Sequence, residues 1–542
     1  MDPRHVSRRR FLWQSSALTA LAATPLNGLS QTAEDALGAE DAKPPTTTDK
    51  NTQYVRVLLR EADGAPLEKE RVTTLHARDL PNDPLPQTII GAEGRVRIAL
   101  AQEALQVSAR LKVPGFGEVY CYADNGGKGF TQVKNVEFVV DAAETRLRRV
   151  REAALELKGL RITDDAVFQK HLEQASRPIP TTTGAAQTAA AYEALSHGLH
   201  AGEQLTMLAA QQRIAKFSVP RKDFLFGCLG SGWQRGGEWE KRFVEAFNFA
   251  TVSWYTWKNE QPQSERIDYW RQDQSLQWAL DRKIVPKGFG YVYMSNGAMA
   301  EWFRTWTWDR VLPEYKRIVE ETTRRYHGRM PYVEVINEAH DKANIFRFSQ
   351  TQVLELTREA CDAARRGSAT IKRQINHCCM WAEYAKRPNT DGTRRWSPFR
   401  YLTDCVKSGV EFETIGLQLY YPQHDLFEIE RMLHRFTAFK RPIHITEISC
   451  NSAEGLDPAS MRPNSLVPPW HGPWTETLQA DWMEAIYTLC YSKPEFQAIG
   501  WWDLSDSGGH FWPHGGLLRG DFTPKESYHR LLKLQKQWGV SK

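Results

Sequence analysis

The chain has 542 residues and a formal net charge of +5, with 41% hydrophobic and 25% charged residues. This composition is typical of a globular protein, and so small a positive charge does not indicate a nucleic-acid partner. The sequence has no uninterrupted apolar run of about 18 residues, so we expect no membrane span in the mature chain. Its length exceeds what one hydrophobic core usually organises, which predicts a large domain with one or two smaller units.

The first 33 residues are typical of an export signal. Ser7-Arg8-Arg9-Arg10-Phe11-Leu12 precedes a weakly apolar stretch over residues 17–26, a pattern that resembles a bacterial twin-arginine signal. We therefore predict a signal peptide over residues 1–33 and an exported protein, periplasmic or extracellular. A disordered basic tail is the alternative interpretation. Residues 34–50, which contain a run of Pro and Thr, are predicted to be a linker.

The eight cysteines show neither a Cys-x-x-Cys spacing nor a paired histidine pattern. We therefore predict no zinc site and no other metal site. Because a protein exported through a twin-arginine signal folds before export, most of these cysteines are expected to be buried thiols.

Residues 51–142 are predicted to form a small β-sandwich. Three runs in this region alternate apolar and polar side chains and are separated by Gly and Pro turns: residues 54–58, 95–98 and 136–140. Tyr120, Tyr122 and Phe130 surround an Asp-Asn-Gly-Gly turn. Because sugars stack on exposed aromatic rings, this group leaves two interpretations open: a carbohydrate-binding module, or a domain that only packs against the rest of the chain.

The rest of the chain is predicted to be a helical connector and a barrel. Residues 143–216 show the apolar spacing of helices, interrupted by Pro and Thr at residues 177–183. Within residues 217–542 we predict eight strands, at residues 224–230, 249–255, 289–294, 332–338, 374–381, 414–421, 442–449 and 498–506. Amphipathic helices are predicted at residues 238–248, 267–283, 314–327, 350–366, 426–440, 475–491 and 526–538. This order predicts an α/β fold, a (β/α)8 TIM barrel, with its active site at the carboxyl ends of the strands.

Two glutamates lie at the ends of predicted strands four and seven. They belong to the motifs Val335-Ile336-Asn337-Glu338 and Ile445-Thr446-Glu447-Ile448. A retaining glycosidase needs one carboxyl that protonates the leaving oxygen and one that attacks the anomeric carbon, about 5 to 5.5 Å apart. Glu338 and Glu447 are therefore the candidate catalytic pair. The alternative is that Asn337 caps the following helix and Glu338 forms a surface ion pair.

Other side chains at the strand ends are suited to a sugar. The amide of Asn337 is suited to contact a sugar hydroxyl. Glu447 ends an apolar run and needs a partner, because an unpaired buried carboxylate is costly; Tyr420 is the candidate donor, and Gln418 is expected to help orient the site. Trp502 and Trp512 are candidates for the floor of the sugar site, with ordinary core packing as the alternative.

In these motifs the segment from about residue 224 to residue 534 resembles glycoside hydrolase family 10, the retaining endo-β-1,4-xylanases. The two glutamate motifs match the acid/base and nucleophile motifs of that family, and three further stretches are similar in the same order, at residues 415–418, 502–506 and 517–528. The resemblance implies a barrel enzyme in which Glu447 attacks the sugar while Glu338 acts as acid and then as base. It implies no cofactor.

Strands two and three depart from that family. Where it has Gly-His-Thr-Leu-Val-Trp-His on strand three, this chain has Gly288-Phe289-Gly290-Tyr291-Val292-Tyr293-Met294. On strand two the polar residues of the family are replaced in Ser253-Trp254-Tyr255-Thr256-Trp257-Lys258, and Tyr420 stands where the family has a His. The hydrolytic residues are therefore kept while the sugar-gripping ones differ. Tyr293 is the candidate substrate contact on the altered strand three.

The resulting prediction is a retaining glycoside hydrolase that acts on a β-linked polysaccharide or oligosaccharide, with xylan as the first candidate. Ordinary xylan is doubtful as the substrate, because a site built to hydrogen-bond one sugar rejects analogues. The alternatives are a barrel glycosidase for another β-glycan and a non-catalytic carbohydrate-binding protein on the same scaffold. As the nucleophile, Glu447 is expected to have the lower pKa of the two glutamates.

Overall fold

The computed structural model describes residues 52–541, apart from residues 93, 255–256, 262, 264–265, 341–342, 390–391 and 466. The signal peptide over residues 1–33 and the linker over residues 34–50 lie outside the described residues and stay predictions, and so does the altered pair at positions 255 and 256 of strand two. No helix among the described residues is long and apolar enough to cross a membrane.

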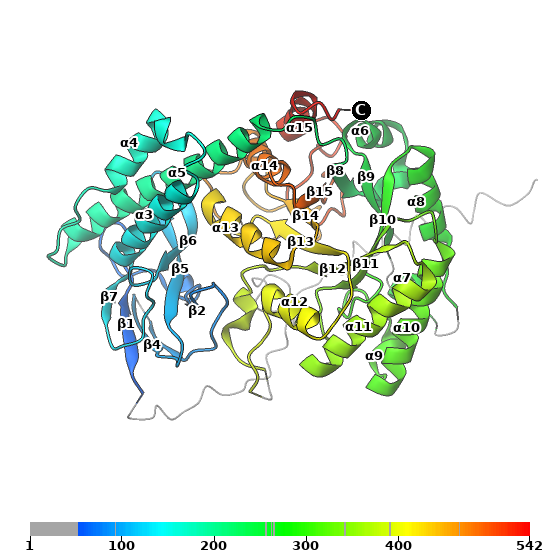
Figure 1. The fold of residues 1–542 in the computed structure, drawn as a ribbon, viewed down its shortest axis with the longest axis horizontal. Helices are drawn as coiled ribbons and strands as arrows, with labels where there is room; N and C mark the ends of the chain where they lie inside the picture. The colour runs from blue at the N-terminus through cyan, green and yellow to red at the C-terminus, as the bar shows by residue number, and fades with distance from the viewer. Residues whose placement is uncertain are drawn as a thin grey trace, which may run out of the picture.

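Two β-sheets form the N-terminal unit, drawn in blue in Figure 1. One sheet has the strand order β3-β4-β1-β7 and the other has the order β2-β5-β6. The elements are β1 (Tyr54–Leu58), α2 (Lys69–Val72), β2 (His76–Asp79), β3 (Ile89–Ala92), β4 (Arg95–Ala99), β5 (Leu105–Val113), β6 (Gly117–Ala123) and β7 (Asn135–Glu137). Alternate residues of β1, Val55 and Val57, are buried, as expected for a strand with one face on a core.

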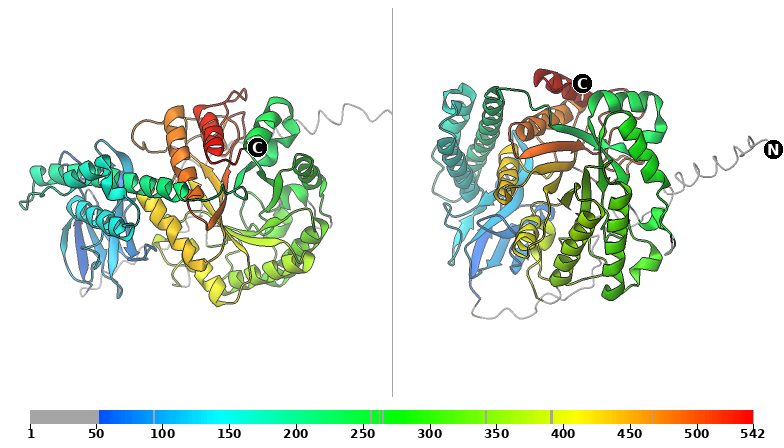
Figure 2. Two further views of the ribbon diagram at one scale, coloured as in Figure 1. Left: turned by 45° about the horizontal axis from the view of Figure 1, so that its top comes forward. Right: turned by 45° about the vertical axis from the view of Figure 1, so that its right-hand side comes forward.

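Helices connect this unit to the barrel. They are α3 (Phe138–Glu156), η1 (Ile162–Asp164), α4 (Ala166–Ala175) and α5 (Ala185–Ala215). Figure 2 shows the long helix α5 running from the N-terminal unit toward the barrel. The strand predicted over residues 136–140 is wrong in its second half, because β7 ends at Glu137 and α3 begins at Phe138. Phe138, Val139 and Ala142 are all buried on one helical face, which an alternating strand could not achieve.

Eight parallel strands close into a barrel with the order β10-β11-β12-β13-β14-β15-β8-β9, which confirms the predicted fold. The strands are β8 (Leu225–Leu229), β9 (Phe249–Trp254), β10 (Val285–Phe289), β11 (Tyr332–Asn337), β12 (Lys372–His377), β13 (Thr414–Tyr420), β14 (Ile443–Ser449) and β15 (Phe496–Trp501). The helical elements around and between them are η2 (Gly230–Arg235), α6 (Gly237–Ala246), α7 (Trp257–Glu260), α8 (Trp270–Asp281), α9 (Glu301–Arg304), α10 (Trp308–Arg325), α11 (Gln350–Gly367), η3 (Glu383–Lys386), α12 (Pro398–Lys407), α13 (Leu426–Phe436), η4 (Thr437–Phe439), α14 (Glu476–Tyr491) and α15 (Glu526–Gln537).

Strand three was predicted in the wrong place, at residues 289–294. The strand in the barrel is β10, which ends at Phe289. Gly290 has a φ of +60°, which turns the chain out of the strand, and Val292 forms only an isolated bridge with Ile336. The true strand was hidden because it contains a proline and Lys287, a residue type that is rarely buried.

Two helices also differ from the prediction. Helix α10 begins at Trp308, six residues before the predicted start, and carries Pro313 inside it. Helix α12 was not predicted. It begins with Pro398 after Ser397, whose side chain caps the helix by accepting a hydrogen bond from the backbone N–H of Arg400.

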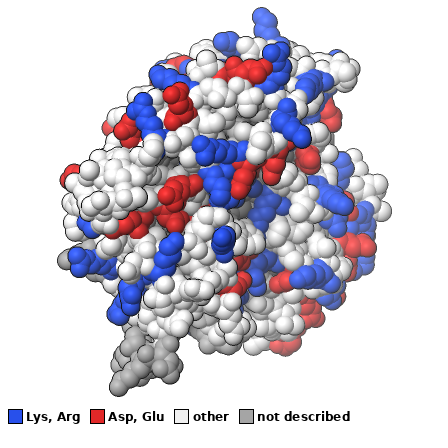
Figure 3. All heavy atoms as spheres, turned by 60° about the vertical axis from the view of Figure 1, so that its left-hand side comes forward, with Lys and Arg blue, Asp and Glu red and all other residues white. Residues whose placement is uncertain are grey.

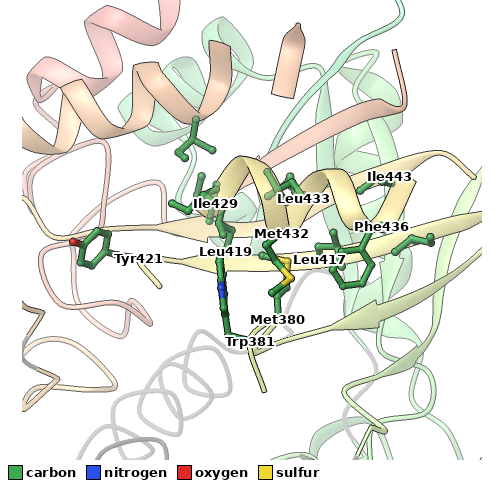
Figure 4. Packing of buried hydrophobic residues seen from close by; sticks show 14 of the residues in the cluster. Met380, Trp381, Leu417, Leu419, Tyr421, Ile429, Met432, Leu433, Phe436 and Ile443 are labelled. Carbon is green, nitrogen blue, oxygen red and sulfur yellow. The ribbon is translucent and has the colours of Figure 1, made fainter. Parts of the chain in front are cut away.

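The barrel is held by apolar layers between its strands and helices. Figure 4 shows one such layer, in which Ile429, Met432 and Leu433 of α13 pack on Leu417 and Leu419 of β13. All eight cysteines are thiols, and all but Cys379 are buried, as expected for thiols that pack as small apolar residues.

The N-terminal unit and its connector are joined to the barrel by ion pairs that are buried or half-buried. Arg146 of α3 donates two hydrogen bonds to Asp425, at 3.0 and 2.7 Å, and Arg435 of α13 pairs with Asp83 at 2.6 Å. On the face of the molecule shown in Figure 3, exposed acidic and basic side chains alternate, and neither sign of charge covers a large area.

The aromatic group that left open a carbohydrate-binding module is not exposed. Tyr120, Tyr122 and Phe130 are each less than 8% exposed, and the ring of Tyr120 stacks on His424 of the barrel at 4.9 Å. Tyr120 and Tyr122 therefore belong to the packing between the unit and the barrel, Phe130 is buried within the unit, and a glycan cannot reach these three rings.

Candidate active site

Glu338 follows the carboxyl end of β11 in an uncommon backbone conformation. Its φ is +53°, and its N–H donates to the carbonyl oxygen of Asn376 at 3.0 Å. Both carboxyl oxygens accept hydrogen bonds: Oε1 from the amide of Gln418 at 2.8 Å and Oε2 from the hydroxyl of Tyr293 at 3.3 Å. The side chain is half-buried, so it is held on two sides and still reaches solvent.

Glu447 lies inside β14 and is only 5% exposed. The hydroxyl of Tyr420 donates to its Oε2 at 2.6 Å, which is the contact expected from the sequence. The ladder between β13 and β14 shifts register just before Gln418, and this shift pairs Gln418 with Glu447 across the two strands. The other oxygen, Oε1, has no hydrogen-bond partner among the described residues.

The pKa of Glu447 is raised, contrary to the low pKa that the sequence led us to expect for the nucleophile. Burial raises the pKa of this carboxyl well above its ordinary value of 4.5, and the negative charges of Glu334 and Glu338 raise it further. The hydrogen bond from Tyr420 and the charge of Lys287 act in the opposite direction. Gln418, which pairs with Glu447 across the two strands, also donates to Glu338, so both candidate carboxyls lie at the same end of the barrel.

A buried ion pair lies beneath the two glutamates. Lys287 of β10 and Glu334 of β11 are 2.9 Å apart and at most 1% exposed. Burial raises the pKa of Glu334, and Lys287 counteracts that effect. Because Lys287 also acts on the pKa of Glu447, the pair is part of the electrostatic environment of the site.

A chain of three hydrogen-bonded side chains fixes the amide of Asn337. The hydroxyl of Thr446 donates to Asn376 Oδ1 at 2.7 Å, and Asn376 Nδ2 donates to Asn337 Oδ1 at 2.9 Å. Gly416 makes room for this chain, since a Cβ there would lie 2.3 Å from Asn376 Oδ1. Asn337 is 1% exposed, and its Nδ2 has no partner among the described residues. It is therefore a fixed donor beside Glu338.

The two predicted tryptophans lie in different surroundings. Trp502 is 6% exposed and packs on Phe289, with ring centroids 5.7 Å apart. Trp512 is half-buried, stacks on Tyr420 at 5.2 Å, and donates from its indole N–H to Asn451 at 2.8 Å. Trp512 thus supports the residue that contacts Glu447, while Trp502 adjoins the altered strand three.

The residues chosen from the sequence are Glu338, Glu447, Asn337, Gln418, Tyr420, Trp502, Trp512 and Tyr293, and the structure connects them through the contacts above. Sequence reasoning missed Lys287, Glu334 and Asn376. Glu334 had a readable signal, since it is a second acid on the same strand as Glu338, four positions earlier. Lys287 and Asn376 had none, because their contacts cross between strands.

This arrangement has the groups needed for acid and base chemistry at an acetal. It offers one half-buried carboxyl with donors on both oxygens and one buried carboxyl with a free oxygen. A fixed amide donor lies on the same strand end. Two carboxyls in such different environments are suited to different roles in one reaction.

The sequence and the structure were also compared with those of known proteins. The sequence profile described as glycosyl hydrolase family 10 matches residues 223–533, more than half of the chain. Among solved structures, xylanase 10B from Thermotoga petrophila RKU-1 in complex with xylobiose has a TM-score of 0.47 and 16% identity, covering 59% of this chain and 96% of its own. Native xylanase 10B from Thermotoga maritima has a TM-score of 0.47 and 16% identity, covering 61% and 98%. No curated protein sequence matches the chain.

Proposed function

The chain belongs to glycosyl hydrolase family 10, and from this premise we propose that it is a retaining hydrolase of a β-linked polysaccharide. In this proposal Glu447 is the nucleophile and Glu338 is the acid and base. The observation that carries the proposal is the inequality of the two carboxyls: Glu447 is buried with one oxygen unpartnered among the described residues, and Glu338 is half-buried and hydrogen-bonded through both oxygens.

In the first step Glu447 Oε1 attacks the anomeric carbon, and the bond from that carbon to the leaving oxygen breaks. Glu338 gives its proton to the leaving oxygen, so that an alcohol departs and a glycosyl ester remains on Glu447. The hydrogen bond from Tyr420 to Oε2 leaves Oε1 as the attacking atom. The Nδ2 group of Asn337 is available to donate to a sugar hydroxyl.

In the second step water attacks the same carbon from the side that the leaving group left. Glu338, now a carboxylate, takes a proton from that water, and Glu447 leaves as a carboxylate. Two inversions give net retention of configuration. These steps require no metal or organic cofactor.

The sugar is proposed to be xylan or a related β-glycan. Membership of the family favours a xylan-type backbone. The altered strand three favours a different pattern of sugar contacts, because Phe289 is apolar and packed on Trp502 while the hydroxyl of Tyr293 is directed at Glu338. A site with different donors selects a different sugar or decoration.

The test is release of reducing sugar from xylan, arabinoxylan, mannan, cellulose and mixed-linkage glucan, with NMR to follow the anomeric configuration of the product. Glu338→Ala should lower the rate on polysaccharide by about 10²- to 10⁴-fold. The same variant should still cleave a dinitrophenyl glycoside, whose leaving group needs no proton. Glu447→Gln should lose both reactions.

Two results would contradict the proposal. An inverted product would exclude the double displacement. Glycan binding without turnover, unaffected by Glu447→Gln, would favour a non-catalytic carbohydrate-binding protein instead.

A further inference from the structure

We propose that Tyr293 is a positioning residue for the acid and base Glu338 rather than a contact to the sugar. This inference rests on the proposed function, because it concerns the proton that Glu338 transfers. It begins from the hydrogen bond between the Tyr293 hydroxyl and Glu338 Oε2, at 3.3 Å.

The segment that carries Tyr293 is fastened to the strand that carries Glu338. The N–H of Val292 donates to the carbonyl of Val335 at 2.9 Å, and the N–H of Asn337 donates back to the carbonyl of Val292 at 2.9 Å. Tyr293 and Glu338 each follow one residue of this reciprocal pair. Their relative position is therefore fixed by backbone hydrogen bonds and not by the side chains alone.

The turn at Gly290 brings the tyrosine to this place. With its φ of +60°, Gly290 ends β10 and redirects the chain along β11. The ring of Tyr293 then packs edge-on against Phe289 at 6.2 Å, which restricts its movement. The sequence change on strand three thus produces a donor aimed at a carboxyl.

Two donors, one from the β10 side of β11 and one from the β13 side, hold the carboxyl of Glu338. Gln418 of β13 holds Oε1 at 2.8 Å, and Tyr293 holds Oε2. Burial and the charge of Glu338 raise the pKa of Tyr293 well above its ordinary value of 10.0, so the phenol keeps its proton and remains a donor. Donors to a carboxylate favour its charged form, which is the form that Glu338 takes when it gives its proton to the leaving oxygen in the first step.

A positioning role through Glu338 predicts a dependence on the leaving group. Only a reaction that needs the proton of Glu338 should respond to the loss of the Tyr293 hydroxyl. A direct contact with the sugar would instead affect every substrate that carries that sugar. The two roles can therefore be separated by comparing glycosides that differ only in the leaving group.

The experiment compares Tyr293→Phe with Tyr291→Phe on aryl glycosides of the sugar released in the polysaccharide assay. Tyr291 lies in the same segment and is buried, and its hydroxyl contacts Met330 rather than Glu338. For Tyr293→Phe we expect kcat/KM to fall about 5- to 20-fold with a phenyl leaving group and to stay within about twofold of wild type with dinitrophenyl. The alkaline limb of the kcat/KM profile for the phenyl glycoside should move up by roughly half a pH unit or more. Tyr291→Phe should change neither quantity.

An equal loss of kcat/KM with both leaving groups, at an unchanged pH profile, would overturn the inference and make Tyr293 a sugar contact. Wild-type values for Tyr293→Phe with both glycosides would overturn it as well. Glu338→Ala on the same two glycosides tests the proposed function separately. If the loss of kcat/KM in Glu338→Ala did not depend on the leaving group, the role of Glu338 as acid and base would be contradicted. Thermal unfolding of both tyrosine variants checks that each is folded.

Discussion

Carboxylates are buried in two regions of the molecule, which differ in the hydrogen-bond partners that they provide. One region is the interface between the N-terminal unit and the barrel, and the other is the mouth of the barrel. At the interface, both oxygens of Asp425 accept hydrogen bonds from Arg146. At the mouth, Glu447 is similarly buried, yet its Oε1 and the Nδ2 of Asn337 have no partner among the described residues. A buried polar atom without a partner costs about 1–3 kcal/mol.

This difference distinguishes a structural region from a candidate functional one. At the interface, the carboxylate of Asp425 serves to join two parts and is matched by a partner of the chain. Where a substrate is to be bound, the matching group is left for the substrate to provide. The comparison therefore predicts that mutations at the interface act on stability and that mutations at the mouth act on catalysis.

The largest effect is expected for Glu447→Gln. Loss of the nucleophile should lower kcat by on the order of 10⁵-fold on any active substrate. Because the change removes a buried charge that lacks full pairing, the free energy of unfolding at pH 7 should be equal to or above that of the wild type. Urea unfolding and steady-state kinetics measure both quantities. A large loss of stability would contradict the prediction that mutations at the mouth of the barrel act on catalysis.

Arg146→Ala should have the opposite outcome. It leaves Asp425, which is fully buried, without its partner, and it should lower the free energy of unfolding by about 3–5 kcal/mol. The kcat of the molecules that remain folded should be close to that of the wild type. Arg161→Ala is the matched control in the same connector, since the Arg161–Asp164 pair is exposed and should contribute less than about 1 kcal/mol. Equal losses in the two variants would contradict the prediction.

Tyr420→Phe should have a smaller effect on catalysis. It removes the hydrogen bond that orients Glu447, and a bond to a charged group is worth about 1.5–3 kcal/mol, so kcat/KM should fall roughly 10- to 100-fold. The acid limb of the pH profile should also move to higher pH, because the lost bond lowers the pKa of Glu447. Tyr421→Phe is the control: its buried hydroxyl has no partner among the described residues, so activity should be unchanged.

The smallest effect is a dependence of stability on pH. The pKa of Glu447 is raised on folding, so the folded state binds its proton more tightly than the unfolded chain does. As pH rises from about 4.5 through the folded pKa, the wild type should lose stability relative to Glu447→Gln, and the difference should then stay constant. Below pH 4, ionisation of Glu447 should contribute nothing to the difference in stability between the two proteins. A difference that does not change with pH would contradict the raised pKa.

Most of the barrel and the two candidate carboxyls could be predicted from the amino-acid sequence. Seven of the eight strands overlap the ranges predicted from alternating and apolar runs, because the periodicity of a strand is written in neighbouring residues, although the predicted strands five and eight end four and five residues too late. Glu338 and Glu447 could be chosen because they end such runs. Tyr420 could be chosen because a buried carboxylate needs a donor.

Apart from the contact of Tyr420 with Glu447, the contacts between these residues could not be predicted in this way, because they form between strands that are distant in sequence. The position of strand three depends on the ion pair of Lys287 with Glu334, a residue of the next strand, which makes a buried lysine tolerable. The contact of Tyr293 with Glu338 depends on the turn at Gly290 and on the register of the neighbouring strand. The raised pKa of Glu447 depends on burial by elements distant in sequence. Local spacing encodes the elements, whereas hydrogen bonds, charges and burial between elements arise only when the barrel closes.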